Sequence, residues 1–452
     1  MQHKSTFFLL CCFLFQTAIL HAQWSTLKMP YRAVYPMSIV LDNKLILAGG
    51  YNTSELTASA VTDKVQIYDL GAQTWSEAKL SKPFRGEQPV QVGSKAYFVV
   101  DTDTVDVYDA LSNTWSVLKI PIPQITRPVV IGKKIYFVST WALLFPSSPL
   151  ENNNEQPLQV YDTETGLWTT LYAPFFCSDP TVVASGKKLY LVNGYLYSNA
   201  NGDQFLKKMQ ALDTETSTWT VSNFNYKHNY MPGFAINGSL YLVGGVSTDD
   251  FVPTGLISIY NEAAGTWTTK NNSLVRADPG VAALGNLIYL AGGYYNFSYQ
   301  KSITTFNTAT NGLLSLSQEL SQGREDIATA SDANRIFFIG GVYRTGPGPN
   351  ILSDVIDVYT APVSAAAEPD LLPLKAYPAL CTEVLTVSLP EGVLAEDCRM
   401  ELWGLDGRQY ALQQLAGNTG EQQISTAHLP AGNYLLRVFA GKQVYGARFV
   451  KM

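Results

Sequence analysis

A basic residue recurs in one kind of place along this chain, a few residues ahead of a strongly apolar segment. Guanidinium groups bind carboxylates and phosphates through paired N–H donors. Several of them gathered on one face would focus a positive potential. The pattern therefore predicts a site for an anionic group, such as the carboxylate of an acidic sugar or of a protein side chain. Its members are Arg32, Arg85, Arg127, Arg276 and Arg324, with His228 in the corresponding place before another apolar segment.

A structural role is the alternative for three of these arginines. Glu87 follows Arg85, Asp278 follows Arg276, and two acids follow Arg324. These three can pair with their neighbours and brace adjacent strands, which is common for charged side chains. Arg32 and Arg127 lack such neighbours, so they are the stronger candidates for ligand binding.

Aromatic residues gather in other loops that we expect on the same face. Trp141, Tyr195 and Tyr295 represent three of these loops. Exposed rings stack on sugar faces and anchor protein partners. Packing of the loops against one another is the alternative role for about half of them. The pattern favours binding over catalysis and leaves the ligand open.

The inventory of chemical residues excludes several classes of site. The chain has four histidines, of which only His228 lies in the repeated part of the sequence. A copper oxidase site needs paired imidazoles and a histidine zinc site needs several, so neither is expected. No nucleophile elbow, Walker loop or dinucleotide fingerprint occurs. A carboxylate pair for glycoside hydrolysis stays open, because such pairs come from distant strands. We expect no cofactor, and the sequence leans away from an enzyme.

The charge balance also limits the partners. The formal net charge is −6, and lysines and arginines form no cluster along the chain. An acidic surface of this kind argues against nucleic acid or anionic lipid as the main partner.

A repeat decides the expected fold. An aromatic or apolar residue is followed seven positions later by tryptophan, with Asp, Asn and Gly between them, which is the chemistry of a hairpin turn. An apolar strand precedes each hairpin, often closed by glycine. We therefore expect radial four-stranded sheets with the tryptophans in the core. The pairs are Tyr68 and Trp75, Tyr108 and Trp115, Tyr161 and Trp168, Leu212 and Trp219, Tyr260 and Trp267, and, in a sixth copy, Phe306 and Leu313.

These residues resemble the Kelch family, whose repeat carries paired glycines, an aromatic residue and a spaced tryptophan. The pairs are Gly49-Gly50, Gly244-Gly245, Gly292-Gly293 and Gly340-Gly341. The resemblance implies an all-β, galactose-oxidase-like propeller, and seven apolar strands give seven blades. The seventh unit lacks its tryptophan, and Trp24 fills the vacancy. We expect the N-terminal strand to close the ring.

The chain divides into four expected parts: a signal peptide at 1–22, the propeller at 23–360, an Ala/Pro-rich linker at 361–374 and a small immunoglobulin-like β-sandwich at 375–452. The first part has Lys4, a short apolar run and Ala22 before the expected cleavage point, which predicts export. That run is too short to span a membrane, and no later stretch is longer, so no membrane span is expected. Cys381 and Cys398 share the last part, where a disulfide is allowed but is not fixed by spacing.

The last part resembles the C-terminal sorting domain of the type IX secretion system of Bacteroidetes. The resemblance implies that the secretion machinery is a partner and that the protein is secreted or attached to the outer-membrane surface. Ala379-Leu380 stands where the family usually has Asn-Pro. The matching segments are Ala376-Tyr377-Pro378, Glu401 to Arg408, Leu429 to Tyr434 and Arg448 to Met452.

Three functions follow from these observations. The leading one is an exported propeller that binds a glycan or a protein at its loop face. The second is a sugar-acting enzyme that resembles the N-acetylneuraminate epimerases among Kelch-like propellers, which would also use an arginine-lined funnel. The third is a purely structural surface protein.

Overall fold

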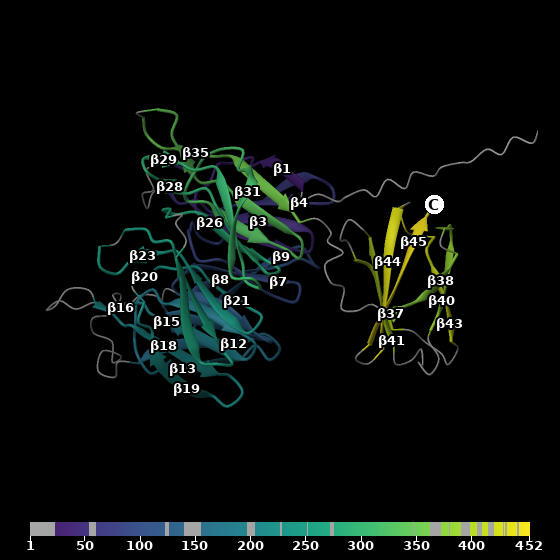
Figure 1. Ribbon diagram of the computed structural model, residues 1–452, viewed down its shortest axis with the longest axis horizontal. Coiled ribbons are helices and arrows are strands. Elements are labelled where there is room, and N and C mark those ends of the chain that lie inside the picture. Colours follow the sequence, from purple (N-terminus) through teal and green to yellow (C-terminus); the bar gives the residue numbers. More distant parts are fainter. Residues whose placement is uncertain are drawn as a thin grey trace, which may run out of the picture. The chain divides into compact units, whose positions relative to one another are not determined.

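The chain forms two compact units, which span Trp24–Tyr359 and Thr360–Met452. Figure 1 colours the first from purple to green and the second in yellow tones. The expected signal peptide, most of the expected linker and Trp141 lie outside the described residues. The computed structural model describes residues 23–53, 60–122, 126–139, 155–196, 204–226, 228–250, 252–271, 275–346, 348–361, 372–378, 380–389, 398–404, 409–414, 420–427, 429, 432–440 and 443–452.

The larger unit consists of four-stranded antiparallel sheets, seven of them in the part of the chain that the structure describes. The first three sheets each take four consecutive strands. They are β2 (Met37–Leu41), β3 (Lys44–Ala48), β4 (Lys64–Asp69) and β5 (Thr74–Lys79); β6 (Val90–Val92), β7 (Lys95–Asp101), β8 (Thr104–Asp109) and β9 (Thr114–Lys119); and β10 (Thr126–Ile131), β11 (Lys134–Ser139), β12 (Gln156–Asp162) and β13 (Trp168–Ala173).

The next three sheets follow the same order, with short strands inserted in their loops. They are β14 (Thr181–Ser185), β15 (Lys188–Val192), β18 (Lys208–Asp213) and β19 (Thr218–Asn223); β21 (Gly233–Ile236), β22 (Ser239–Val243), β24 (Leu256–Asn261) and β25 (Thr266–Asn271); and β26 (Gly280–Leu284), β27 (Leu287–Ala291), β30 (Ser302–Asn307) and β31 (Gly312–Glu319).

The remaining sheet joins the two ends of this unit. Its order is β1 (Gln23–Lys28), β36 (Val355–Thr360), β33 (Arg335–Ile339) and β32 (Ala328–Ser331). The Trp24 ring lies 5.1 Å from the Tyr359 ring, the place that tryptophan takes beside tyrosine in the other sheets. The backbone N–H of Met29 donates to Asp354 O at 2.8 Å. The N-terminal segment thus supplies the outer strand of the sheet that the chain forms last.

Two-stranded ladders form in the loops between the second and third strands or beside them. Such ladders order long connections by adding backbone hydrogen bonds. They are β16 (Tyr195–Leu196) with β17 (Gln204–Phe205), β20 (His228–Asn229) with β23 (Val246–Ser247), β28 (Tyr294–Tyr295) with β29 (Ser298–Tyr299), and β34 (Val342–Tyr343) with β35 (Ile351–Leu352).

The repeated aromatic and tryptophan residues are cross-strand neighbours, as the hairpin prediction requires. Tyr68 stands opposite Trp75 across β4 and β5, and their ring centroids are 4.9 Å apart. Tyr260 and Trp267 repeat this contact at 5.0 Å. The rings are tilted, which suits their quadrupoles. The predicted core role of the tryptophans is confirmed, because they pack against the apolar clusters between sheets.

Neighbouring sheets pack face to face through apolar side chains. One cluster joins Ile46 of β3 to Phe98 of β7. Similar clusters follow along the chain, and the sixth and seventh sheets meet through β26 and β32. The last sheet then packs on the first, because Leu47 of β3 shares a cluster with Phe337 and Ile339 of β33.

Paired glycines end the second strand where a neighbouring loop passes close to the backbone. Gly245 has φ +78°, and a Cβ there would lie 2.1 Å from Asn229 O. Only glycine fits such a position. The second sheet lacks the pair for a structural reason: β7 runs on to Asp101 and meets β8 after two residues, so no long loop packs there.

The smaller unit is a two-layer sandwich. One sheet has the order β37 (Leu372–Pro373), β45 (Gln443–Lys451), β44 (Gly432–Ala440), β41 (Cys398–Gly404) and β42 (Gln409–Gln414), and β39 (Leu380–Cys381) also pairs with β45. The other has β38 (Lys375–Tyr377), β40 (Val384–Ser388) and β43 (Glu421–Ser425).

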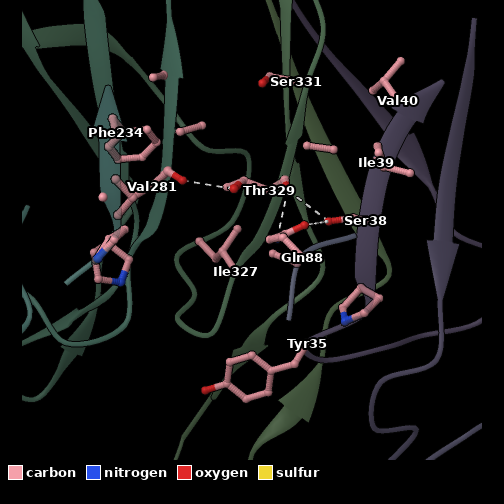
Figure 2. A pocket seen from close by; sticks show the side chains of 18 of the residues that line it. Tyr35, Ser38, Ile39, Val40, Gln88, Phe234, Val281, Ile327, Thr329 and Ser331 are labelled. Carbon is pink, nitrogen blue, oxygen red and sulfur yellow. Dashed lines mark hydrogen bonds between the residues drawn. The ribbon is translucent and has the colours of Figure 1, made fainter. Parts of the chain in front are cut away.

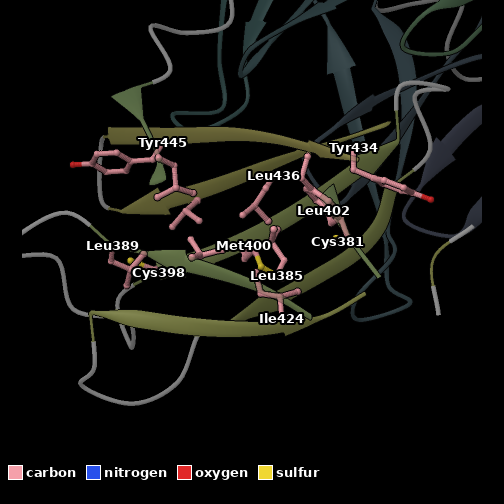
Figure 3. Packing of buried hydrophobic residues seen from close by; sticks show 14 of the residues in the cluster. Cys381, Leu385, Leu389, Cys398, Met400, Leu402, Ile424, Tyr434, Leu436 and Tyr445 are labelled. Atoms are coloured by element: carbon pink, nitrogen blue, oxygen red, sulfur yellow. The ribbon is translucent and has the colours of Figure 1, made fainter. Parts of the chain in front are cut away.

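Apolar side chains from both of these sheets meet in one core (Figure 3). Leu385 of β40 and Met400 and Leu402 of β41 are fully buried there. Cys381 is a buried free thiol, and its Sγ lies 3.6 Å from Thr426 Oγ1. The disulfide that the sequence allowed between Cys381 and Cys398 is therefore not formed.

Candidate functional site

The segments that carry the predicted basic residues join the last strand of one sheet to the first strand of the next. We call them mouth loops, and the end of the larger unit where they lie the loop end. Because all four strands of a sheet are antiparallel, the loops between second and third strands share this end. The hairpins within each sheet, such as residues 163–167, lie at the opposite end.

Arg324 is a fully buried anchor rather than a ligand-binding side chain. Its Nη2 lies 2.8 Å from Asp357 Oδ2 and donates to Phe338 O at 3.0 Å. Its Nη1 donates to Gln322 O at 3.3 Å. The side chain is 0 % exposed, so it braces its own sheet from below the loop.

Arg276 does the same for the preceding sheet. Its Nη1 donates to Gly292 O at 3.1 Å and to Ser302 O at 2.7 Å. Its Nη2 donates to Thr304 Oγ1 at 3.2 Å. Burial lowers the pKa of this guanidinium. The carbonyl oxygens around it accept hydrogen bonds from its N–H groups in place of water.

His228 is the third buried anchor and replaces arginine in its sheet. Burial lowers the pKa of His228, so the ring is neutral. Its Nδ1 donates to Gly244 O at 2.8 Å, and its Nε2 accepts the hydroxyl proton of Ser258 at 2.8 Å. Both ring nitrogens are therefore used inside the sheet.

A signal that the sequence interpretation missed explains these anchors. A buried polar residue stands two positions before the aromatic or apolar residue of each hairpin, on the third strand of its sheet. Thr304 and Asp357 receive Arg276 and Arg324, and Ser258 receives His228. Where such a polar residue has a buried partner on a mouth loop, the two side chains make a structural contact. The set is Gln66, Asp106, Gln159, Gln210, Ser258, Thr304 and Asp357.

Where the mouth loop offers no long side chain, the polar residue of the sheet binds the loop backbone instead. Gln66 accepts from Tyr31 N at 2.8 Å and donates to Tyr31 O at 2.9 Å. Gln210 makes the same pair of contacts with Phe175, at 2.7 and 2.8 Å. Asp106 accepts from Ser81 N and Ser81 Oγ, both at 2.6 Å.

Arg32 and Arg85 do not occupy the position of Arg324. A Cβ on Gly292 would face Arg324 O, and the equivalent glycines face Ala33 O and Phe84 O. Arg32 therefore stands one residue before the anchor position and Arg85 one residue after it. Both side chains are exposed, and the Arg85 guanidinium lies 5.3 Å from the Tyr51 ring centre.

Arg127 lies on a strand rather than in a loop. It is the second residue of β10. Its Nη1 donates to Pro180 O at 2.7 Å, and its Nη2 donates to Glu87 Oε1 at 2.7 Å. Asp179 stands near the same guanidinium. Arg127 thus links the second, third and fourth sheets, and its acidic partner Glu87 comes from a distant loop rather than from its sequence neighbours.

The six basic residues are consequently not gathered into one positive funnel. Three are buried in separate sheets, Arg127 is held by Glu87, and only Arg32 and Arg85 are exposed. The sequence pattern located the mouth loops correctly, but it could not show that their basic side chains turn inward.

The residue two positions after the anchor faces the opposite way and was not singled out. These residues have φ between +44° and +58°, a left-handed conformation that asparagine and aspartate tolerate best. Each stands just before the first strand of its sheet. They are Tyr35, Asp179, Tyr230, Asp278 and Asp326.

Three carboxylates and one tyrosine meet across the last mouth loops. We call Asp278, Glu325 and Asp326 the rim carboxylates. Asp326 N donates to Asp278 O at 3.0 Å, and Tyr35 Oη donates to Asp326 Oδ1. The contact between Tyr35 and Asp326 joins the first sheet to the last.

Burial raises the pKa values of all three rim carboxylates, and neighbouring carboxylates add to the rise at Glu325 and Asp326. Burial and the charges of Asp326 and Asp278 raise the pKa of Glu325 to about 7. Burial and the charge of Asp278 raise the pKa of Asp326 to about 6, although the Tyr35 hydroxyl opposes this rise. Burial also raises the pKa of Asp278. Arg344 is a nearby cation that favours ionised Glu325.

A cavity of about 560 Å³ lies beside these carboxylates, along the first strands β2, β21, β26 and β32 and the loop before β6. Figure 2 shows Phe234 and Val281 on one side, Ile39 and Val40 on the other, and Tyr35 at one end. Pro279 and Ile327, which directly follow Asp278 and Asp326, also line it. The carboxylates therefore border the cavity at its Tyr35 end.

The polar groups along the cavity wall are bound to one another. Ser38 Oγ donates to Thr329 O at 3.0 Å, and Gln88 Nε2 donates to the same oxygen at 3.3 Å. Thr329 Oγ1 donates to Val281 O at 3.0 Å. These bonds tie neighbouring sheets together (Figure 2). They leave a wall in which apolar side chains alternate with polar groups.

Exposed aromatic side chains also occur at the loop end. Tyr295 is 52 % exposed and Tyr230 is 46 % exposed, and Phe297 is more exposed than either. Tyr195 belongs to β16, but its side chain, like Trp141, lies outside the described residues. Tyr295 is thus exposed, and ligand binding by the aromatic loops stays a prediction.

The residues present do not fit a copper site of the kind found in some propellers. His228 is the one histidine of the repeated sequence, and both of its ring nitrogens are hydrogen-bonded within the sheet. In the described ranges, no group of three or more His, Cys, Asp or Glu side chains is arranged to hold a metal ion. The same ranges contain no helix long and apolar enough to cross a membrane.

Comparisons with known proteins point to the same repeat. No family model matches the chain. It is 33 % identical over 87 residues to a Kelch repeat and BTB domain-containing protein 1 of cowpox virus (strain Brighton Red), which is 19 % of this chain and 16 % of that protein. It is 25 % identical over 160 residues to an F-box/kelch-repeat protein of Arabidopsis thaliana, which is 34 % of this chain and 41 % of that protein. The chain thus spans less than half of these relatives.

A solved structure matches over nearly the whole chain. It is described as a novel fungal alcohol oxidase with catalytic diversity among the AA5 family, in complex with copper. The TM-score is 0.55 at 14 % identity, over 95 % of this chain and 99 % of that one. At this identity the likeness concerns the fold. Together with the repeated four-stranded sheets, the comparisons support a Kelch-like, galactose-oxidase-like β-propeller.

Proposed function

We propose that this protein is a binding module that holds a protein partner at the loop end of its propeller. The observation that carries the proposal is the cavity of about 560 Å³, which Tyr35 lines and which the rim carboxylates border through the contact of Tyr35 with Asp326. Binding pockets usually have volumes of about 300–1,000 Å³ and a few polar groups at fixed places. Tyrosines at such a mouth supply large contact areas at low entropic cost.

The geometry favours binding over the sugar-acting enzyme that the sequence left open. That enzyme depended on an arginine-lined funnel for an acidic sugar. Arg276 and Arg324 are instead bound to carbonyl oxygens and to Asp357 inside their sheets. A purely structural role predicts no saturable ligand at the loop end.

The proposal includes the architecture and the route of export. Seven sheets form one ring, and β1 closes it; pairing of β1 with β36 and packing of the last sheet on the first support this. The signal peptide at 1–22 and the sorting domain at 375–452 deliver the propeller to the cell surface or the medium. The support for this route is the sequence resemblance of the last 78 or so residues together with their sandwich fold.

Selection of peptides on the full chain tests the binding function. We expect random dodecapeptides displayed on phage to yield a consensus that binds saturably. A variant with Tyr35→Ser and Tyr230→Ser should lose this binding. The matched control, Leu111→Ser and Leu167→Ser, removes two exposed apolar side chains from hairpins at the opposite end and should keep it.

Two outcomes would overturn the proposal. A selection that gives no saturable peptide would support a structural role. Peptides that bind both variants equally would place the binding surface elsewhere. Saturable binding of a neutral or acidic glycan in place of any peptide would move the assignment to carbohydrate.

The export route has a separate test. Expression in a bacterium with type IX secretion should place the full chain outside the outer membrane. Removal of residues 375–452 should leave the propeller in the periplasm. Equal export of both forms would remove the sorting role from the C-terminal unit.

A further inference from the structure

We propose that the cavity and its border take a basic segment of the partner, in which lysine or arginine flanks one apolar side chain. This inference rests on the proposed binding function and names the chemistry of its ligand. It replaces the anionic ligand that the arginine pattern predicted. It depends on the charge of the cavity border, on the cavity wall and on the connection between the two.

The first step is the charge that the border of the cavity presents. Asp278, Glu325 and Asp326 stand together there. The arginines that lie close to them in sequence, Arg276 and Arg324, are buried and bound within their sheets. At this part of the border the carboxylates set the local field, with Arg344 opposing it. The exposed Arg32 and Arg85 stand on the mouth loops before β2 and β6. A partner of opposite charge gains most from the field of the carboxylates.

The second step is the wall of the cavity. Pro36, Ile39, Val281 and Phe234 line it, and the hydroxyl and amide groups of Ser38, Gln88 and Thr329 are bound to neighbouring strands. An apolar side chain can enter without leaving a polar group of the wall unsatisfied.

The third step is the connection between these two surfaces. Tyr35 lines the cavity, and its hydroxyl donates to Asp326. Asp278 and Asp326 directly precede Pro279 and Ile327, which line the cavity. A peptide whose apolar side chain enters the cavity thus brings the neighbouring side chains of its own backbone over the carboxylates. Tyr35 and Tyr230 add faces on which a cation can lie.

The test compares four peptides of equal length on the full chain by isothermal titration. They carry a central leucine flanked by two lysines, two glutamines or two glutamates, or a central serine flanked by two lysines. We expect the lysine–leucine peptide to bind at least about tenfold more tightly than the glutamine–leucine peptide, and less so in high salt. The glutamate–leucine peptide should bind most weakly, and the lysine–serine peptide should lose most of its affinity.

Matched variants assign the charge effect to the cavity border. Glu325→Gln with Asp326→Asn should remove most of the preference for lysine over glutamine, while binding of the glutamine–leucine peptide stays within about twofold. The control, Glu164→Gln with Glu215→Gln, removes two exposed carboxylates from hairpins at the opposite end and should preserve the preference.

The results separate this inference from the proposed function. If peptides bind at the mouth but lysine gives no advantage, or if both double variants lose the preference equally, the basic segment is wrong and the binding module stands. If no peptide binds in a manner that depends on Tyr35 and Tyr230, the proposed function itself is wrong.

Discussion

The mouth loops before β26 and β32 and those before β2 and β14 are anchored by hydrogen bonds from opposite sides of the contact. In the first pair, Arg276 and Arg324 reach from the loop into the sheet. In the second pair, Gln66 and Gln210 reach from the sheet to the loop backbone. The mouth loop is anchored in both, so an arginine on the loop and a glutamine on the third strand of the sheet have equivalent roles.

This comparison explains why the basic pattern suggested a ligand site. The anchor position holds arginine or histidine where a polar group of the sheet receives the side chain, and alanine or phenylalanine where that polar group binds the loop backbone instead. Residue type at that position therefore reports the local partner on the third strand. The residue two positions after the anchor does not bind the third strand. Asp278 and Asp326 occupy this position and lie at the loop end.

The largest expected effect follows from removing the partner of a buried arginine. Asp357→Ala leaves the Arg324 guanidinium without its carboxylate at 0 % exposure. Breaking one half of a buried ion pair costs about 3–5 kcal/mol. Urea unfolding of the full chain should show this loss in the transition of the larger unit. The exposed pair of Glu164 with Lys133 is the control, where Glu164→Ala should cost under about 1 kcal/mol. Equal losses would mean that the buried pair is not an anchor.

A neutral anchor should be weaker than the ion pair. Gln210→Ala removes two hydrogen bonds to the backbone of Phe175 and leaves buried polar groups, at a cost of about 2 kcal/mol. Hydrogen exchange at the Phe175 amide should accelerate, whereas the amide of Tyr31, which Gln66 holds, should not change. If both amides respond alike, the loops are not anchored one by one.

The histidine anchor adds a dependence on pH that arginine and glutamine lack. Burial lowers the pKa of His228, so the unfolded chain binds a proton below its ordinary value of about 6.5 and the folded chain does not. Stability from this group is therefore present above that pH and is lost as the pH falls, by at most about 1.4 kcal/mol per pH unit. Thermal unfolding of His228→Asn should show a smaller loss between pH 7 and 5 than the original chain. An unchanged difference at every pH would contradict this.

The sequence predicted the repeated hairpins because their period is fixed by covalent spacing. Tyr68 and Trp75 had to face each other once a turn lay between them, and the apolar strands had no other place than the core. The sequence did not reveal that Arg127 lies on β10 and binds Glu87. That contact joins two sheets, and its register is set by packing. The raised pKa values of Glu325 and Asp326 were hidden for the same reason, since Asp278 comes from another loop.

The smallest expected effect on stability comes from the rim carboxylates on the mouth loops. The pKa values of Glu325 and Asp326, about 7 and about 6, lie above their unfolded values, so folding favours the protonated forms. Their contribution to stability is present below about pH 4 and is lost as the pH rises through 6 and 7, the reverse of His228. Glu325→Gln with Asp326→Asn should therefore stabilise the propeller by on the order of 1 kcal/mol at pH 8, after allowance for partial exposure.

The same double variant should gain little at pH 4, where the carboxylates are protonated in either state. Asp278, Tyr35 and Arg344 face these groups and stay unchanged in the variant, so the difference between the two proteins isolates the pair. A gain that is equal at both pH values would show that the rim carboxylates do not repel one another. A gain confined to pH 8 would mean that the loop end keeps a destabilising cluster of charge, which is expected where charge serves binding rather than folding.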